Sequence, residues 1–216
     1  MAKGAKDMLE KQWERQLNIQ TGADWSFFPF LYYYPYEPTP YHVLEILAEQ
    51  FKICSHDHVV DFGSGKGRLC FYLNAVFNAS TRGIEINEEL VSAAKKNLNR
   101  YIKKFPNGKD RIFFDHIRAE HYEIRPGDNK FYFFNPFSVQ IFIKVINNIL
   151  LSVERFPRDV DVILYYPSIE YIPFLENRTS FTLTKEIFIS GDYERDQNER
   201  ILIYSLKTGG KNNIND

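Results

Sequence analysis

The chain of 216 residues has the length of one α/β domain with a short extension, and a domain of that size buries a substantial core. Hydrophobic residues make up 44% of the chain and charged residues 25%, which excludes a wholly disordered protein. Lys and Arg total 27 against 28 Asp and Glu, so the basic excess of a dedicated nucleic-acid-binding protein is absent.

Cysteine and histidine are too scattered to predict a metal site or a disulfide framework. Cys54 and Cys70 are the two cysteines, and neither belongs to a CxxC pair. The five histidines show no metal-binding or Ser-His-Asp spacing. The N-terminal residues lack the apolar core of a signal peptide, and no apolar run reaches the roughly 18 residues that cross a membrane. We therefore expect a cytoplasmic protein without a metal.

The N-terminal extension combines an amphipathic helix with an aromatic loop. Residues 5–19 can form a helix with Met8, Trp13 and Leu17 near one side. Four prolines between residues 20 and 40 exclude regular helix there. The same stretch is rich in Trp, Phe and Tyr, so we interpret it as an ordered loop that packs on the rest of the chain.

From Pro40 onward, helical and strand patterns alternate. Helices are expected at 41–52, 67–78, 88–105, 138–153 and 168–176. Strands are expected in the runs HVVDF and GIEI and at 111–117, 130–134 and 160–166. Repeated βα units imply a parallel sheet with helices on both faces, which binds ligands at the carboxyl ends of its strands. The runs FTLTKEIFI and RILIYSLK then predict a closing antiparallel hairpin.

The segment VVDFGSGKGR, from Val59 to Arg68, is a buried strand that turns through three glycines into a helix. Glycines allow a tight turn and a close approach of backbone to a ligand, although such a turn can also be purely structural. The NAD fingerprint requires glycine where this chain has Arg68. Glu85 ends the next strand, 18 positions after Gly67, where a carboxylate can accept hydrogen bonds from ribose hydroxyls.

These residues resemble the first two motifs of the class I S-adenosylmethionine (SAM)-dependent methyltransferases, and the resemblance covers roughly residues 36–206. It implies an α/β, Rossmann-like fold whose mainly parallel seven-stranded sheet has the order 3-2-1-4-5-7-6 and ends in the antiparallel hairpin. The chain then divides into an extension that covers the cofactor site (1–40), the SAM-binding domain (41–207) and a disordered tail (208–216).

The resemblance also assigns cofactor contacts. Asp61 and the glycine loop would hold the methionine end of SAM, Glu85 the ribose and Ile86 one face of the adenine. Glu120 is the candidate for the adenine amino group, although Arg118 stands where Asp is commoner. Thr39 either contacts the SAM carboxylate or caps the following helix. The full expected set is Thr39, Asp61, Gly63, Ser64, Gly65, Gly67, Glu85, Ile86, Ala119 and Glu120.

Asn135, Pro136 and Phe137 follow the fourth strand and resemble a shortened Asn-Pro-Pro-aromatic motif of amino-group methyltransferases. In that motif the Asn side chain and the Pro carbonyl accept hydrogen bonds from the target nitrogen, and the ring stacks on a planar substrate. An Asn-Pro pair that merely ends a strand is the alternative. Residues expected to line the acceptor site are Tyr36, Tyr165 and Tyr166.

The expected reaction is direct methyl transfer from SAM to an acceptor, with nitrogen favoured. A protein or small-molecule acceptor is favoured because the charge is balanced, and RNA stays open. Two other functions compete. A SAM-binding module without catalysis would lack an acceptor channel beside Asn135, and a nucleotide-linked oxidoreductase is disfavoured by Arg68.

Overall fold

A seven-stranded sheet forms the middle of the computed structural model, which describes residues 3–22, 34 and 36–209. Its strands run in the order β3-β2-β1-β4-β5-β7-β6, which confirms the predicted topology. Only β7 is antiparallel to its neighbours, β5 and β6. The strands are β1 (His58–Phe62), β2 (Ser80–Glu85), β3 (Ile112–His116), β4 (Lys130–Phe134), β5 (Val160–Tyr165), β6 (Thr182–Phe188) and β7 (Arg200–Leu206).

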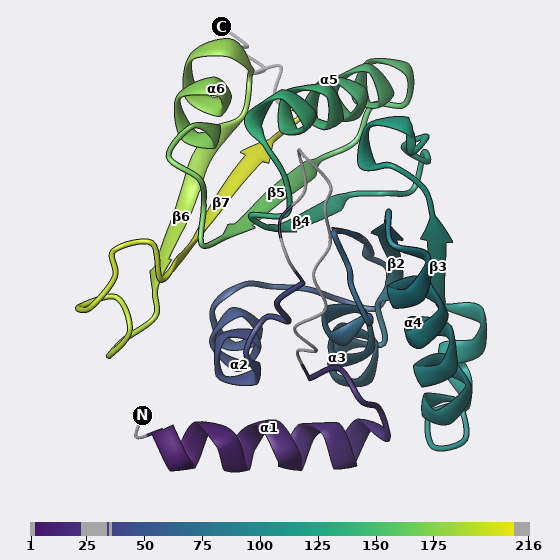
Figure 1. The fold of residues 1–216 in the computed structure, drawn as a ribbon. Helices are drawn as coiled ribbons and strands as arrows, with labels where there is room; N and C mark the ends of the chain where they lie inside the picture. Colours follow the sequence, from purple (N-terminus) through teal and green to yellow (C-terminus); the bar gives the residue numbers. More distant parts are fainter. Residues whose placement is uncertain (1–2, 23–33, 35, 210–216) are drawn as a thin grey trace, which may run out of the picture.

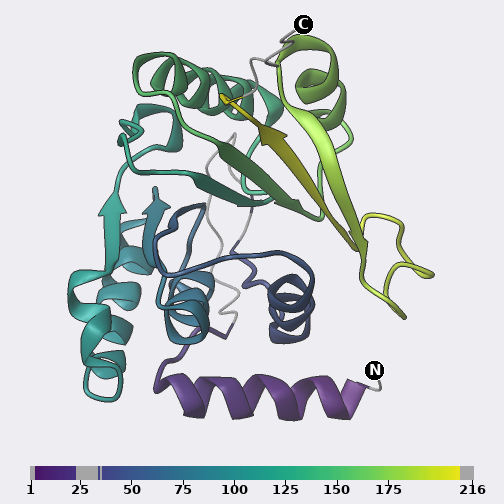
Figure 2. The same ribbon diagram turned by 180° about the vertical axis from the view of Figure 1, so that it is seen from behind.

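Helices cover both faces of the sheet (Figure 1). Helices α2 (Tyr41–Gln50), α3 (Arg68–Phe77) and α4 (Glu88–Tyr101) lie on one face, and α5 (Val139–Arg155) and α6 (Tyr171–Arg178) on the other. Helix α1 (Lys3–Leu17) lies outside α2 and α3, and the view from behind shows the same arrangement (Figure 2). Two short 3-10 helices, η1 (Pro106–Asp110) and η2 (Ala119–His121), were not expected from the sequence.

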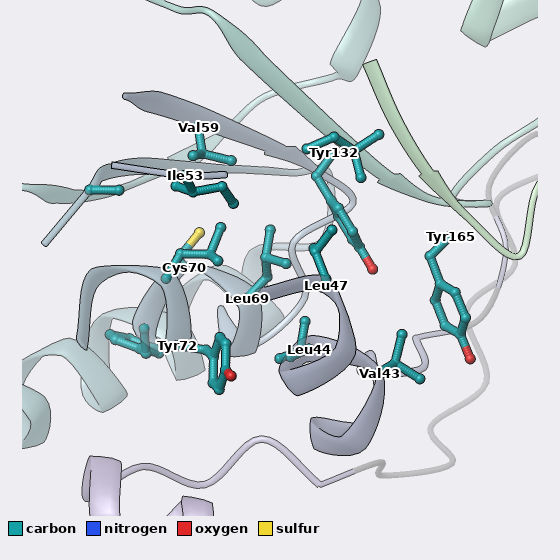
Figure 3. Close-up of a cluster of buried hydrophobic side chains, with 14 of the residues drawn as sticks. Val43, Leu44, Leu47, Ile53, Val59, Leu69, Cys70, Tyr72, Tyr132 and Tyr165 are labelled. Carbon is teal, nitrogen blue, oxygen red and sulfur yellow. The ribbon is translucent and has the colours of Figure 1, made fainter. Parts of the chain in front are cut away.

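Alternating side chains of the strands build two cores. Val59 and Tyr132 point toward α2 and α3, whereas Val60 and Phe133 point toward α5. Figure 3 shows the first core, in which Tyr132 and Tyr165 extend from the sheet toward α2. Because β1 to β5 run parallel, their carboxyl ends, and the loops that follow them, lie along one edge of the sheet.

Parts of the predicted extension and tail lie outside the described residues. The aromatic run that includes Trp25, Phe27 and Phe28 is among them, as is 210–216 of the expected tail. Within the described part of that tail, the Thr208 N–H donates to Oδ1 of Asp159 at 2.9 Å. None of the described helices is long and apolar enough to cross a membrane.

Candidate active site

The loop between β1 and α3 carries three glycines in left-handed backbone conformations. The φ angle is 80° at Gly63, 53° at Gly65 and 87° at Gly67, a region that other residues rarely adopt. The N–H groups of Gly63 and Ser64 donate to the Ile84 carbonyl at 2.9 and 3.2 Å, which ties the loop to β2. The segment therefore forms the tight strand-to-helix turn that its glycines predict.

Gly65 lies directly against the ring of Tyr36. A Cβ atom at Gly65 would lie 1.9 Å from Cε2 of Tyr36, so a larger residue would displace the ring. The Tyr36 hydroxyl donates to the Thr21 carbonyl at 2.6 Å, and burial raises its pKa. The structure thus places Tyr36, which was expected to line the acceptor site, against the glycine loop.

Glu85 has both carboxylate oxygens held by backbone N–H groups. Oε2 accepts from Gly65 and Oε1 accepts from Asn87, each at 2.9 Å. Burial raises the pKa of Glu85, and these N–H groups oppose the shift in part. Each carboxylate oxygen has a further lone pair, so Glu85 can still accept hydrogen bonds from two hydroxyl groups. Its contact with ribose stays a prediction.

Asp61 is a second buried carboxyl group behind the same loop. Its Oδ2 lies 3.9 Å from Sγ of Cys70. Burial, followed by the nearby charge of Glu85, raises the pKa of Asp61 from 3.8 to about 8. Two buried carboxyl groups so close to one loop favour a ligand that carries positive charge, because such a ligand stabilises their ionised forms.

The expected adenine contacts occupy the next two strand ends. Ile86 follows β2, and its carbonyl lies 2.8 Å from Nε2 of His116. Ala119 is buried in η2. The Glu120 side chain is mostly buried, and its Oε1 lies 3.9 Å from Nη1 of the half-exposed Arg118. The topology therefore brings these residues to the same edge as the glycine loop, while their contacts with adenine stay predictions.

Asn135 follows β4 in a left-handed conformation, with φ of 39°. None of the residues that the structure describes makes a hydrogen bond with its buried Oδ1. Pro136 lies against the glycine loop, since a Cβ atom at Gly63 would be 2.5 Å from Cβ of Pro136. The Pro136 carbonyl accepts the N–H of Tyr34 at 3.1 Å, which occupies part of the acceptor capacity expected for it.

Buried polar atoms without a hydrogen bond within the described part of the chain gather at this edge. Ser64 follows β1, Asn135 and Ser138 follow β4, and Arg200 begins β7 beside the end of β5. These groups are Ser64 Oγ, Asn135 Oδ1, Ser138 Oγ and Arg200 Nε. Because an unsatisfied buried polar group destabilises a fold, these four atoms make this edge of the sheet the candidate ligand site.

The Phe137 ring differs from its expected role. It is fully buried and packs edge-on against Phe133, with ring centroids 6.1 Å apart. Its carbonyl accepts a hydrogen bond from the Tyr171 hydroxyl. In this structure the ring is therefore part of the core around α5 and presents no open face for stacking.

Tyr165 ends β5, where it pairs with Phe134 at the end of β4, and Tyr166 follows it. The Tyr165 hydroxyl donates to Oε2 of Glu199 at 2.5 Å, and the Tyr166 hydroxyl donates to Oδ2 of Asp196 at 2.6 Å. Burial and the carboxylate partner raise the pKa of Tyr165. Tyr165 is buried, whereas Tyr166 is partly exposed, so Tyr166 is the better placed of the two to contact an acceptor.

Thr39 does not cap α2. The N-cap residue is Pro40, without a side-chain hydrogen bond, so the capping interpretation is wrong. The Thr39 hydroxyl instead lies 2.8 Å from that of Tyr132, and its carbonyl accepts from Arg68 at 3.2 Å. Sequence reasoning used Arg68 only to reject the NAD fingerprint. Because a cation in the first turn of a helix needs acidic partners, the position of Arg68 at the start of a predicted helix was a signal that carboxylates lie near it.

Solved structures share this arrangement of sheet and helices. Human methyltransferase 10 domain containing protein matches with a TM-score of 0.60 at 12% identity, over 95% of this chain and 97% of that one. An RNA methyltransferase from Salinibacter ruber, in complex with S-adenosyl-L-homocysteine, matches with a TM-score of 0.54 at 17% identity, over 83% and 100%. The chain has the class I methyltransferase fold.

At the sequence level, the chain is similar to a protein-lysine N-methyltransferase of Saccharolobus islandicus (strain REY15A). Identity is 36% over 67 residues, which are 31% of this chain and 42% of that protein. The similarity therefore spans less than half of the relative's length. No protein-family model matches the chain.

Proposed function

We propose that this protein is a SAM-dependent methyltransferase that methylates a nitrogen atom, with an amine of a protein as the favoured acceptor. The observation that carries the proposal is the buried Oδ1 of Asn135 at the end of β4. It has no partner among the described residues and lies in the loop that packs on Gly63 through Pro136. A hydrogen-bond acceptor in that place suits an N–H group that is about to be methylated.

The residues around the glycine loop fit SAM better than a dinucleotide. SAM carries positive charge on its sulfonium and amino groups, whereas the pyrophosphate of NAD is anionic. Asp61 and Glu85 are both buried behind the loop, and Glu85 already accepts the Gly65 N–H that a phosphate would require. A cationic cofactor would lower the electrostatic free energy of these carboxylates, and a pyrophosphate would raise it.

Asn135 supplies orientation and charge stabilisation during transfer. SAM, when bound, supplies an electrophilic methyl group. An amine that donates an N–H to Asn135 Oδ1 has its lone pair held in one direction, which allows an in-line attack without a covalent enzyme intermediate. As the nitrogen becomes positive, the Asn135 carbonyl dipole stabilises the new charge.

A protein amine is supported by three features. The relative from Saccharolobus islandicus is a protein-lysine N-methyltransferase. Asp196 and Glu199 lie beside Tyr166 and Tyr165, where carboxylates attract a cationic side chain. Deprotonation of a lysine at neutral pH costs about 4 to 5 kcal/mol; the rings of Phe134 and Tyr166 lower that cost by disfavouring the charged amine, whereas Asp196 and Glu199 raise it.

The test is to incubate the protein with methyl-labelled SAM and separate protein, RNA and metabolite fractions from the source cell. We expect label in the protein fraction and its loss in the Asn135→Ala variant. Label in RNA alone would show that the acceptor is RNA rather than protein, while the protein would still be a methyltransferase. Tight SAM binding without label in any fraction would favour a SAM-binding module.

A further inference from the structure

Arg68, in the first turn of α3, connects separate parts of the N-terminal region. The side chain is 5% exposed. Nε donates to Oγ1 of Thr21 at 2.7 Å, and Nη1 donates to Oε2 of Glu10 at 2.5 Å. Nη1 also donates to the Thr39 carbonyl at 3.2 Å, and Nη2 lies 3.5 Å from Oε1 of Glu14. The helix dipole opposes a cation at this end of α3, so these partners hold the guanidinium.

The contacts continue to the glycine loop. The Glu14 carboxylate accepts both the N–H and the hydroxyl of Thr21. The Thr21 carbonyl accepts the hydroxyl of Tyr36, whose ring lies against Gly65. We call this connected set the Arg68 clasp: Glu10, Glu14, Thr21, Tyr36, Thr39 and Arg68.

A second attachment of α1 meets the Arg68 clasp at Tyr41, whose ring lies 4.4 Å from the Arg68 guanidinium and whose hydroxyl donates to Oε1 of Glu14 at 3.0 Å. The Trp13 ring stacks on Tyr41 with centroids 5.8 Å apart, and its Nε1 donates to Oε1 of Glu45 at 2.8 Å. On the other side, a hollow of about 670 Å³ lined by Lys11, Arg68 and other residues separates α1 from α4. On the clasp side α1 combines these polar contacts with the fully buried side chain of Leu17, and loss of the Arg68 contacts still leaves Leu17 and the Trp13–Glu45 hydrogen bond to hold the helix.

We propose that Arg68 is a positioning residue of the cofactor site, which holds α1 and Tyr36 against the glycine loop so that the loop reaches its binding shape only when α1 is seated. The inference rests on the proposed function for its ligand, because SAM is the molecule that the loop would bind. Coupling of this kind is reciprocal: bound cofactor must also hold α1 in place.

The test compares Arg68→Met, Arg68→Lys and the double variant Glu10→Gln/Glu14→Gln with the unmodified chain. Hydrogen exchange of α1 and of residues 62–70 is measured without ligand, and the dissociation constant of S-adenosylhomocysteine is measured by calorimetry. In Arg68→Met we expect faster exchange in both segments and binding weaker by about tenfold, within the usual range of coupling between sites. Arg68→Lys should restore part of the exchange protection and part of the affinity. The double variant removes the acidic partners on α1 and should therefore show the same faster exchange and weaker binding as Arg68→Met.

Arg82→Met is the matched control, because Arg82 is also buried and paired, with Asp115 at 2.6 Å, but lines a hollow at the opposite edge of the sheet. It should lower stability without changing ligand affinity. The proposal is overturned if Arg68→Met frees α1 while loop exchange and affinity stay unchanged, or if Arg82→Met weakens binding equally. If the unmodified chain does not bind the ligand, the proposed function fails. Hydrogen exchange of residues 62–70 in the variants then still shows whether Arg68 couples α1 to the glycine loop.

Discussion

Asn135 combines three features that a residue at the end of a strand does not need for structure alone. It adopts a left-handed conformation, its Oδ1 is buried, and no described residue bonds to that atom. Strained backbone and an unsatisfied polar atom both cost free energy, so their coincidence at one residue points to function. The sequence motif predicted the residue, and the structure supplies the free acceptor.

Asn135→Ala should lower kcat by roughly a hundredfold, the scale for loss of one preorganised polar contact in a transition state. The SAM dissociation constant should change little, because the expected cofactor contacts lie mainly after β1 and β2. Turnover measured at saturating SAM and calorimetry of SAM binding separate the two effects. Parallel loss of binding and turnover would make Asn135 a cofactor or structural residue.

Asp61 predicts a pH dependence of stability. Its folded pKa of about 8 lies above the ordinary value of 3.8, so the folded state binds the proton more tightly. Its contribution to the free energy of unfolding is therefore full below pH 4 and is lost as the pH rises to about 8. Asp61→Asn removes this loss. The free energy of unfolding of the variant relative to the unmodified protein should therefore be higher at pH 8 than at pH 4, by on the order of a few kcal/mol.

Urea unfolding of both proteins at several pH values measures this difference. The same variant should bind SAM more weakly, because an amide, unlike the Asp61 carboxyl group, cannot lose a proton when a cationic ligand approaches. A stability difference that is independent of pH would show that the pKa of Asp61 does not change on folding, and would contradict the raised value.

At the scale of elements, the glycine loop makes the sharpest prediction. Gly65→Ala places a Cβ atom where Tyr36 lies and forces alanine to a φ of 53°. We expect destabilisation of about 1 to 3 kcal/mol and at least tenfold weaker binding of S-adenosylhomocysteine. Gly127→Ala is the control, because its nearest neighbour would lie at 3.6 Å. Equal affinity in both variants would contradict the assignment of the loop.

The sequence predicted most elements because apolar periodicity and glycine are local signals. The β4 bounds were predicted as found, and helix α3 differs from expectation by one residue at each end. Helix α4 ends at Tyr101 rather than at Phe105, and the Tyr101 ring packs over Gly108 of η1. That contact joins residues whose spacing carries no periodic signal.

The site was harder to predict than the fold, because the contacts that the sequence did not reveal join residues far apart in the chain. Phe137 becomes core because the Tyr171 hydroxyl of α6 binds its carbonyl and Phe133 packs on its ring. Arg68 takes its partners from the other end of the N-terminal region, Glu10 among them. A single sequence shows that such residues exist and does not show which of them meet.

For the whole molecule, cofactor binding should raise the thermal stability of the fold. S-adenosylhomocysteine at a hundred times its dissociation constant stabilises the folded state by about 2.7 kcal/mol. For a chain of this size that corresponds to a rise in Tm of roughly 5 to 10 °C. A thermal scan with and without ligand measures it, with NAD at the same concentration as the control. Equal shifts for both ligands would contradict the preference for a cationic cofactor.

The chemical stability of the transferred methyl group decides whether this protein methylates nitrogen. Protein labelled by the enzyme from methyl-labelled SAM is divided, and one half is treated with mild base while the other is hydrolysed in acid to amino acids. We expect the label to resist base and to elute with methylated lysine. Release of the label by base as methanol would identify a carboxyl ester and contradict the role assigned to Asn135.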